Sequence, residues 1–193
     1  INLPEILLEL KEENAGFQYD LLNHYLDKKN LKGTYSDSNY NFDIEIDISS
    51  DVCAKCILIN QDDLLLVSGP ALDSGDVEII DDFKNILIPS SIKEKFTVSY
   101  ANIDIDEVMY NLNSGLIAQT VVTRNTYLFY KKYYSYLKIQ DNLGLINLVW
   151  KFPYDDGSII DDVNDYLLLE DTQDFITDLK DKYYSSNTIT SHI

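Results

Sequence analysis

The chain has 193 residues, of which 45% are hydrophobic, and a formal net charge of −18. Its length fits one domain with a buried core, and its apolar content excludes a disordered chain. No run of about 18 apolar residues occurs, so no membrane-spanning helix is predicted, and the acidity argues against nucleic acid or anionic membrane as a partner. Two cysteines and the absence of Asn-x-Ser/Thr sites indicate an intracellular, reducing location, most simply the cytoplasm.

The first half of the chain predicts two helices followed by strands. Apolar residues recur at helical spacing near the N-terminus and again further on, where one face would carry Phe17, Leu21, Leu22, Tyr25 and Leu26. The stretch NFDIEIDIS then alternates apolar and acidic residues, which is typical of a strand with one buried face. Further strands are predicted over 52–60, 63–68 and 76–80, with Gln-Asp-Asp as a turn between the first two.

The second half predicts a short helix within another run of strands. A strand is expected over Phe96–Tyr100, followed by a helix that Asp104 caps and Gly115 ends. A meander of three strands is then expected, over LIAQTVVT, TYLFYKKYYSYLKI and LINLVWKF. Its two turns would lie at Arg124-Asn125 and between Asp141 and Gly144.

The last part of the chain predicts two helices. Ser158 and Asp161 resemble a capping box, and a final helix would place Phe175 and Leu179 on one face. The elements together predict an α+β fold with an N-terminal helical pair, a largely antiparallel sheet of about six to eight strands, and C-terminal helices packed on the sheet. We expect a single α+β domain over 1–185 and a flexible C-terminal tail over 186–193.

The stretch TYLFYKKYYSYLKIQ is rich in rings and lysines, in contrast to the acidic chain around it. Residues 124–151 contain five basic side chains against one acidic side chain, so this segment carries +4 and the rest −22. As a strand, it would present one contact face made of Tyr130, Lys132, Tyr134, Tyr136 and Lys138. Read as a helix, it would form a stripe of Tyr127, Tyr130, Tyr134 and Leu137, but the aromatic content and the strand-like neighbours favour the strand. The alternatives are a buried sheet strand, which composition favours, and a platform for single-stranded nucleic acid, which the remaining negative charge opposes.

Three carboxylates, Asp43, Glu45 and Asp47, would project from one face of the alternating strand. Such a row could hold a divalent metal for hydrolysis or phosphoryl transfer. It is more often the solvated face of a strand, where charge discourages aggregation. A metal enzyme is therefore kept only as the alternative reading of this chain.

Cys53 and Cys56 form a CxxC motif within the sequence VCAKCILI, which predicts a strand. A thioredoxin-type site needs this motif at a helix N-terminus, and a zinc site needs a second pair of ligands. In a strand, a separation of three residues would place the sulfurs on opposite faces with Cα atoms roughly 10 Å apart. We therefore favour structural cysteines without a bridge, with metal or redox use as the lesser alternative.

The sequence carries no motif of a known reaction, and no family resemblance is identified. Charge complementarity favours a non-catalytic, acidic protein-interaction module that binds a basic protein partner. Such a module would be an inhibitor or immunity-type protein, or a subunit of a larger assembly. No cofactor is predicted, an enzyme is the less favoured reading, and the sequence specifies no oligomeric state.

Overall fold

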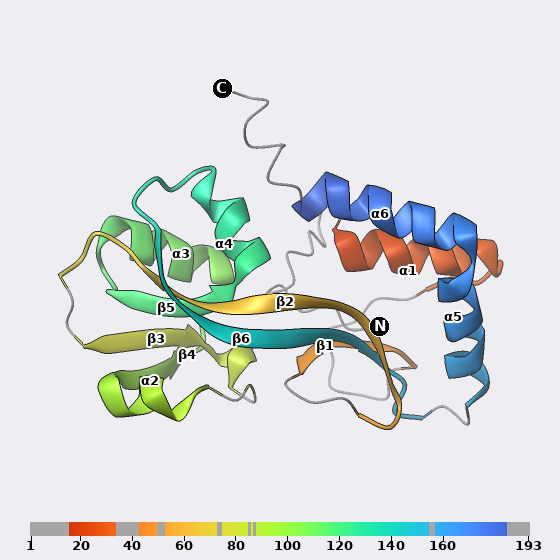
Figure 1. Cartoon of the computed structure of the whole chain (residues 1–193), viewed down its shortest axis with the longest axis horizontal. Helices are drawn as coiled ribbons and strands as arrows, with labels where there is room; N and C mark the ends of the chain where they lie inside the picture. The colour runs from red at the N-terminus through yellow and green to blue at the C-terminus, as the bar shows by residue number, and fades with distance from the viewer. Residues whose placement is uncertain are drawn as a thin grey trace. The chain divides into compact units, whose positions relative to one another are not determined.

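The computed structural model describes residues 16–33, 43–49, 53–72, 75–84, 86, 88–154 and 157–184 (Figure 1). The elements in chain order are α1 (Phe17–Lys28), β1 (Glu45–Ser49), β2 (Cys56–Ser68), β3 (Asp76–Ile80), the 3-10 helix η3 (Asp81–Phe83), α2 (Ser90–Lys95), β4 (Thr97–Ala101), α3 (Ile105–Ser114), β5 (Gln119–Thr123), α4 (Arg124–Lys131), β6 (Lys138–Lys151), α5 (Ser158–Leu168) and α6 (Glu170–Tyr184).

The strands form a four-stranded sheet in the order β1-β6-β2-β5 and a separate pair, β3-β4. β2 and β5 are antiparallel, with Leu64 opposite Thr123, whereas β3 and β4 are parallel. The predicted α+β class, with a largely antiparallel sheet and helices at both ends of the chain, is confirmed. The first helix of the predicted N-terminal pair lies outside the described residues, as does the predicted tail.

The chain divides into two units. Unit 1 comprises Ile1–Asp47, Val52–Asn60 and Leu148–Ile193, and unit 2 comprises Ile48–Asp51 and Gln61–Asn147. The boundary between the units falls within three strands, β1, β2 and β6. This division does not test the prediction of a single domain over 1–185, which stays a prediction.

Unit 1 has a helical layer in which α6 lies beside α1 and α5, as Figure 1 shows. The apolar face predicted for the second helix is confirmed, because Phe17, Leu21 and Leu22 of α1 are almost completely buried. The alternation predicted for the first strand is also confirmed, since Ile46 of β1, in unit 1, and Ile48, which belongs to unit 2, are both buried. Burial of these side chains, at about 1.5–3 kcal/mol each, is the main stabilising contribution.

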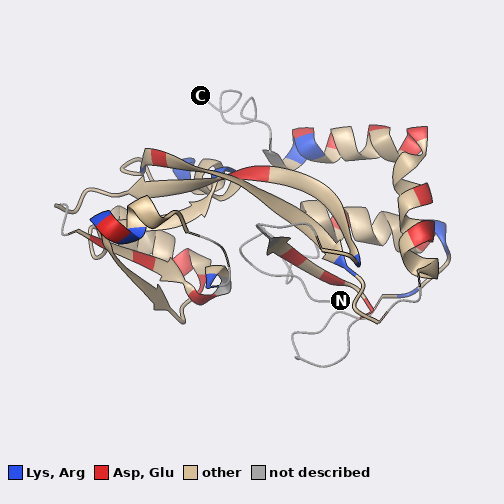
Figure 2. Cartoon of the chain, turned by 60° about the horizontal axis from the view of Figure 1, so that its bottom comes forward, with Lys and Arg blue, Asp and Glu red and all other residues tan. Residues whose placement is uncertain are grey.

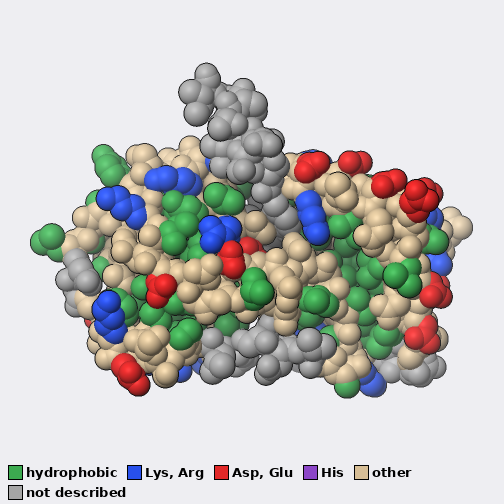
Figure 3. All heavy atoms as spheres, in the orientation of Figure 1, with side chains coloured by type: hydrophobic (Ala, Val, Ile, Leu, Met, Phe, Trp, Pro, Cys, Tyr) green, Lys and Arg blue, Asp and Glu red, His purple; other side chains and the backbone are tan. Residues whose placement is uncertain are grey.

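The outer surface of α5 and α6 is strongly acidic. Figure 2 shows the acidic positions in red along the ribbons of these two helices, and Figure 3 shows red side chains on the surface there. The exposed members are Asp161, Asp165, Glu170, Asp171, Asp174, Asp178 and Asp181. Their exposure, opposite a buried apolar face that includes Val163, Tyr166 and Leu179, is that of an ordinary amphipathic helix surface.

Unit 2 places β3 against both β4 and β5, with α3 packed on β3 and β5. α3 begins and ends as predicted, because the Asp104 carboxylate accepts a hydrogen bond from the Glu107 N–H at 2.8 Å and Gly115 adopts a left-handed conformation with φ of 82°. β3 has the predicted bounds, 76–80. No helix in the described part of the chain is long and apolar enough to cross a membrane.

The segment that begins TYLFYKK is the clearest error of the sequence prediction. Residues 124–131 form the helix α4, turns follow, and the next strand begins only at Lys138. The predicted turn at Gln-Asp-Asp is also wrong, because β2 continues through these residues without interruption. Aromatic residues favour strands only where a sheet neighbour is available, and here the segment instead starts at a capped helix terminus.

Two smaller predictions also need correction. Ser158 is the first helical residue of α5, and the N-cap is Gly157, which makes no side-chain capping bond, so the predicted capping box is absent. Cys53 and Cys56 form a disulfide with a Cα–Cα distance of 5.2 Å. The strand begins only at Cys56, and the turn at residues 54–55 brings the two cysteines within bridging distance.

Candidate functional site

The candidate site lies in unit 2, where β5 ends and α4 begins. Thr123, the last residue of β5, is the N-cap of α4, and its hydroxyl accepts a hydrogen bond from the Thr126 N–H at 3.2 Å. The two threonine hydroxyls also bond to each other at 2.9 Å. Threonine is a favoured N-cap because its oxygen satisfies a helix N–H that has no partner within the helix. The first residue of α4, Arg124, is thereby held in a defined position.

A buried carboxylate from β2 completes the start of this helix. Asp62 is only 8% exposed, and its two oxygens accept hydrogen bonds from the N–H of Asp63 at 2.8 Å and of Asn125 at 3.1 Å. Burial raises the pKa of Asp62, although these two backbone hydrogen bonds act in the opposite direction. The positive end of the α4 dipole therefore already faces an anion supplied by the chain itself.

Beside Asp62, the next carboxylate pairs with a cation. The Nε atom of Arg124 lies 2.7 Å from Oδ2 of Asp63, and both side chains are partly exposed. The hydrogen bond from Arg124 holds the pKa of Asp63 below its usual range, helped by a hydrogen bond from Asn142. Asp63 is thus an ionised, half-accessible anion whose position is fixed by two donors.

The guanidinium of Arg124 has donors that this pair does not use. A guanidinium has five N–H donors, and the bond to Asp63 engages Nε. Within the described part of the chain, Asp63 is the only acceptor that Arg124 contacts. Tyr127, one turn further along α4, is half-buried, and burial raises the pKa of its hydroxyl while the nearby Arg124 lowers it.

Asp63, Arg124 and Tyr127 are called the α4 cluster below. The cluster presents a carboxylate and a guanidinium side by side, with an aromatic ring on the next turn. A guanidinium binds a carboxylate through two parallel hydrogen bonds, and a carboxylate binds an ammonium group. The arrangement is therefore complementary to a small zwitterion.

The predicted contact residues do not share a strand face. Tyr130 is buried in α4 and donates a hydrogen bond to Asp106, and its ring stacks on that of Tyr134 at 6.0 Å. Lys132 lies over the Phe129 ring, and Tyr136 is 61% exposed in a turn. The fifth predicted residue, Lys138, is exposed at the start of β6. These five residues lie in a helix, in turns and in a strand, so they lack the common face on which the prediction was based. Their role in contact with a partner stays a prediction.

The carboxylate row predicted as a metal alternative is arranged differently. Asp43 precedes β1, whereas Glu45 and Asp47 belong to it. The carboxylate of Asp47 lies 2.7 Å from the Lys151 ammonium, so its partner is a cation of the chain. The described residues contain no group of three or more His, Cys, Asp or Glu side chains that could hold a metal ion.

The sequence did not identify the α4 cluster. The pattern assigned Gln-Asp-Asp and Arg124-Asn125 to two turns that are 61 residues apart, and nothing local links them. β2 and β5 bring them together, because Leu64 is paired with Thr123. A usable signal would have been Thr123 as an N-cap, since a threonine directly before residues with an apolar face at helical spacing also fits a helix start.

Comparison with known proteins identifies a fold. No family model matches the chain, and no curated protein matches its sequence. Among solved structures, a mutant of ArgBP from T. maritima is 12% identical with a TM-score of 0.67, covering 89% of this chain and 86% of that one. A substrate-binding protein of an amino acid ABC transporter is 15% identical with a TM-score of 0.63, covering 88% of both chains. The GluR0 ligand-binding core in complex with L-glutamate is 10% identical, with a TM-score of 0.61 over 89% of this chain and 90% of that one.

These likenesses overturn the function predicted from charge. The prediction of an acidic interaction module for a basic protein partner, acting as inhibitor or complex subunit, is wrong, because the matching structures include a ligand-binding core in complex with L-glutamate and a substrate-binding protein of an amino acid ABC transporter. Net charge informs about solubility and steering but not about fold, which explains the error. At 10–15% identity the likeness shows the fold alone, and that fold is the one found in these amino-acid-binding proteins.

Proposed function

We propose that the chain binds a small zwitterionic ligand of the amino-acid type. The observation that carries this proposal is the fold likeness, which extends over nearly the whole length of this chain and of each amino-acid-binding protein it matches. Fold alone does not specify function, so the proposal also needs a site of suitable chemistry. The α4 cluster supplies one, because it contains both a cation and an anion at the surface of unit 2.

In this proposal each charged group of the ligand has a partner in the α4 cluster. The terminal nitrogens of Arg124 would bind the ligand carboxylate, and Asp63 would accept from its ammonium group. Asp62 would act as a positioning residue, because its carboxylate holds the start of α4 through the Asn125 N–H. Tyr127 would offer its ring to an apolar part of the ligand.

The disulfide supports a proposal about location. The intracellular location expected from the sequence remains untested by the structure. We propose instead that the protein works in an oxidising compartment, because a bond between Cys53 and Cys56 persists where thiols are not kept reduced. Mass spectrometry of native protein after alkylation without reductant checks this. Two alkylated cysteines in protein from its natural source would contradict the proposal.

Calorimetry with a panel of amino acids tests the binding proposal. A ligand at about 100 times its Kd adds about 2.7 kcal/mol of stability, so a rise in the melting temperature provides a second measurement. If no amino acid releases heat on mixing or shifts the melting temperature, the proposed function is wrong. The panel covers acidic, basic, polar and apolar side chains, so that the preferred class is identified with the same protein sample.

Two variants then test the site separately from the function. Arg124→Met should weaken binding at least tenfold, and Arg124→Lys should restore little, because an ammonium cannot reproduce the two-pronged contact. Lys84→Met removes one exposed positive charge from the same unit and should bind as the unmodified protein does. Unchanged affinity in Arg124→Met would reject the α4 cluster as the site while leaving amino-acid binding established.

A further inference from the structure

A pocket in unit 2 lies between α2 and the edge of the β3-β4 pair. It has a volume of about 450 Å³ and is lined by Lys93, Phe96, Thr97, Val98 and Tyr100. Pockets of about 300–1,000 Å³ are of the size that holds small molecules. The pocket shares no residue with the α4 cluster, so it is a separate feature of the same unit.

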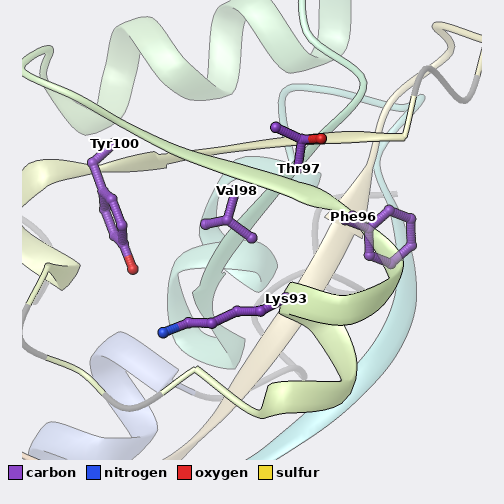
Figure 4. Close-up of a pocket in the computed structure, with 5 residues that line it drawn as sticks. All are labelled: Lys93, Phe96, Thr97, Val98 and Tyr100. Carbon is purple, nitrogen blue, oxygen red and sulfur yellow. The ribbon is translucent and has the colours of Figure 1, made fainter.

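The lining of this pocket combines apolar and aromatic side chains with polar groups. Figure 4 shows Val98 and Tyr100 projecting from β4 on the side where the Lys93 side chain extends from α2. In the parallel register Val98 is paired with Val77 and Tyr100 with Ile79, and both β3 residues are completely buried. Paired residues of neighbouring strands project to the same face, so the apolar surface of the core continues into the floor of the pocket.

One positive charge faces this apolar surface. Figure 4 shows the stem of Lys93 running beneath Val98, with its ammonium group near the end where the Tyr100 hydroxyl points. Lys93 makes no ion pair with any residue in the described part of the chain, and α2 is held in place by the buried Ile92. An ammonium without a partner and a phenolic hydroxyl on the same side are a donor pair suited to a carboxylate.

The lining also excludes one class of ligand. None of the five lining residues is acidic, so the ammonium group of a zwitterionic amino acid would find no anionic partner among their side chains and would meet the Lys93 charge. Like charges repel at short range, and an acid lacking the amino group avoids this repulsion. In this respect the pocket differs from the α4 cluster, where Asp63 provides the acceptor.

We propose that the pocket between α2 and β4 is a binding site for a small monocarboxylate with an apolar or aromatic body and no amino group. Lys93 and the Tyr100 hydroxyl bind the carboxylate, and Val98 and Phe96 contact the apolar body. This site is independent of the proposed amino-acid binding, because it uses other residues and selects against the ligand that the α4 cluster selects.

Titration of 3-phenylpropionate, followed by NMR of the Val98 methyl groups, tests the proposal at the pocket itself. The expected result is a saturable shift of these methyl signals. L-Phenylalanine has the same ring and carboxylate but carries an ammonium group. Its dissociation constant, measured on the same signals, should be at least ten times higher. A Val98 shift that is as strong with L-phenylalanine, or no shift with 3-phenylpropionate, would overturn the proposal.

The role of Lys93 is tested by exchanging its charge for an apolar stem of similar length. Lys93→Met should weaken the binding of 3-phenylpropionate at least tenfold, and Lys84→Met serves as the matched loss of one exposed positive charge in the same unit. Lys93 is exposed, so the variant should fold, which circular dichroism verifies. Equal affinity in the two variants would refute the site, whatever the amino-acid panel shows for the α4 cluster.

Discussion

Units 1 and 2 fix their helices in different ways. In unit 1 the helices are joined by side chains from distant parts of the sequence. The Tyr25 hydroxyl donates to Asp162 at 2.7 Å across 137 positions, and the Tyr183 hydroxyl donates to Asp20 at 2.6 Å across 163 positions. Unit 2 also joins α4 to α3 by a tyrosine–aspartate bond, from Tyr130 to Asp106, but it adds side-chain caps at the starts of these two helices. The Asp104 carboxylate caps α3, and Thr123 caps α4.

The difference explains two features of the composition. Tyrosine and aspartate are abundant in this chain, and unit 1 uses them as partners across helices, where a phenolic hydroxyl donates to an ionised acceptor. In unit 2 carboxylates at the helix starts compensate the positive ends of the dipoles. Acidic residues that looked like a charged surface in the sequence are therefore partly structural, and the following changes test each unit on its own terms.

The largest effect is expected from removing the buried indole of unit 1. Trp150 is fully buried, and its Nε1 donates to the Gln18 side chain at 2.7 Å, which joins β6 to α1. Trp150→Ala should lower the free energy of unfolding by about 3–5 kcal/mol, because it leaves a cavity and removes the hydrogen bond to Gln18. Urea unfolding followed by circular dichroism measures this. A loss below about 1 kcal/mol would show that this long-range contact does not hold unit 1 together.

In unit 2 a close contact between two backbone segments, at Gly69 and at Leu112, should have the next largest effect. A Cβ atom on Gly69 would lie only 1.9 Å from the Leu112 carbonyl oxygen in α3, so the end of β2 must approach that helix with no side chain between them. Gly69→Ala should destabilise the protein by about 1–3 kcal/mol through a backbone shift. The same unfolding measurement applies. An unchanged stability would mean that α3 moves away without cost and that the contact does not define unit 2.

Removing the Asp62 carboxylate, which is buried at the start of α4, should have an intermediate effect. Asp62→Ala leaves the N–H groups of Asp63 and Asn125 without their acceptor, and it should cost about 1–2 kcal/mol. Hydrogen exchange should show faster exchange of the Asn125 amide in this variant. Asp104→Ala, which removes the cap of α3 in the same unit, is the matched comparison and should leave the Asn125 amide protected.

A smaller change is expected from removing one hydroxyl between the helices of unit 1. Tyr25→Phe deletes the donor to Asp162, which also pairs with Lys29 at 2.9 Å. Because Asp162 keeps that second partner, the cost should be about 0.5–1.5 kcal/mol. A double-mutant cycle with Asp162→Asn isolates the pair, and a coupling energy near zero would assign the stabilisation to ring packing alone.

The smallest effect should be a pH dependence located in unit 1. The His24 ring stacks on that of Phe175 at 4.0 Å, and burial, together with the nearby Lys28, lowers the pKa of His24. The folded value lies below the unfolded value of about 6.5, so this stabilisation is present above that pH and is lost as the pH falls through the folded pKa. Melting temperatures between pH 7 and pH 5 should decline less in His24→Gln than in the unmodified protein. Parallel declines would assign the dependence to other groups.

Prediction from the sequence succeeded where local pattern and tertiary packing agree. The helix over 17–28 has one apolar face, and its residues Phe17, Leu21 and Leu22 are buried as the spacing indicated. The strand at 76–80 and the helix between Asp104 and Gly115 follow from equally local signals, namely alternation, an N-cap and a left-handed glycine. These features need no information from elsewhere in the chain.

The candidate site could not be predicted, because its parts are far apart in the sequence. Asp63 and Arg124 are separated by 61 positions, and each looked like part of a turn. The pocket between α2 and β4 presented only weak local signals, a lysine in a short helix and alternating apolar residues in a strand. Chemistry that depends on a pair of residues becomes visible only when the strands that carry them are placed side by side.

The sequence by itself determined the α+β class, the buried face of α1, the strand β3 and the limits of α3, because periodicity and capping act over a few residues. Tertiary structure alone decided that the aromatic segment after Thr123 becomes the helix α4. Strand preference depends on the sheet neighbour, whereas the N–H of Asn125 finds its acceptor in Asp62, which β2 supplies. That long-range hydrogen bond, and the Arg124–Asp63 pair beside it, turned a stretch that resembles a strand into the start of a helix that carries the candidate site.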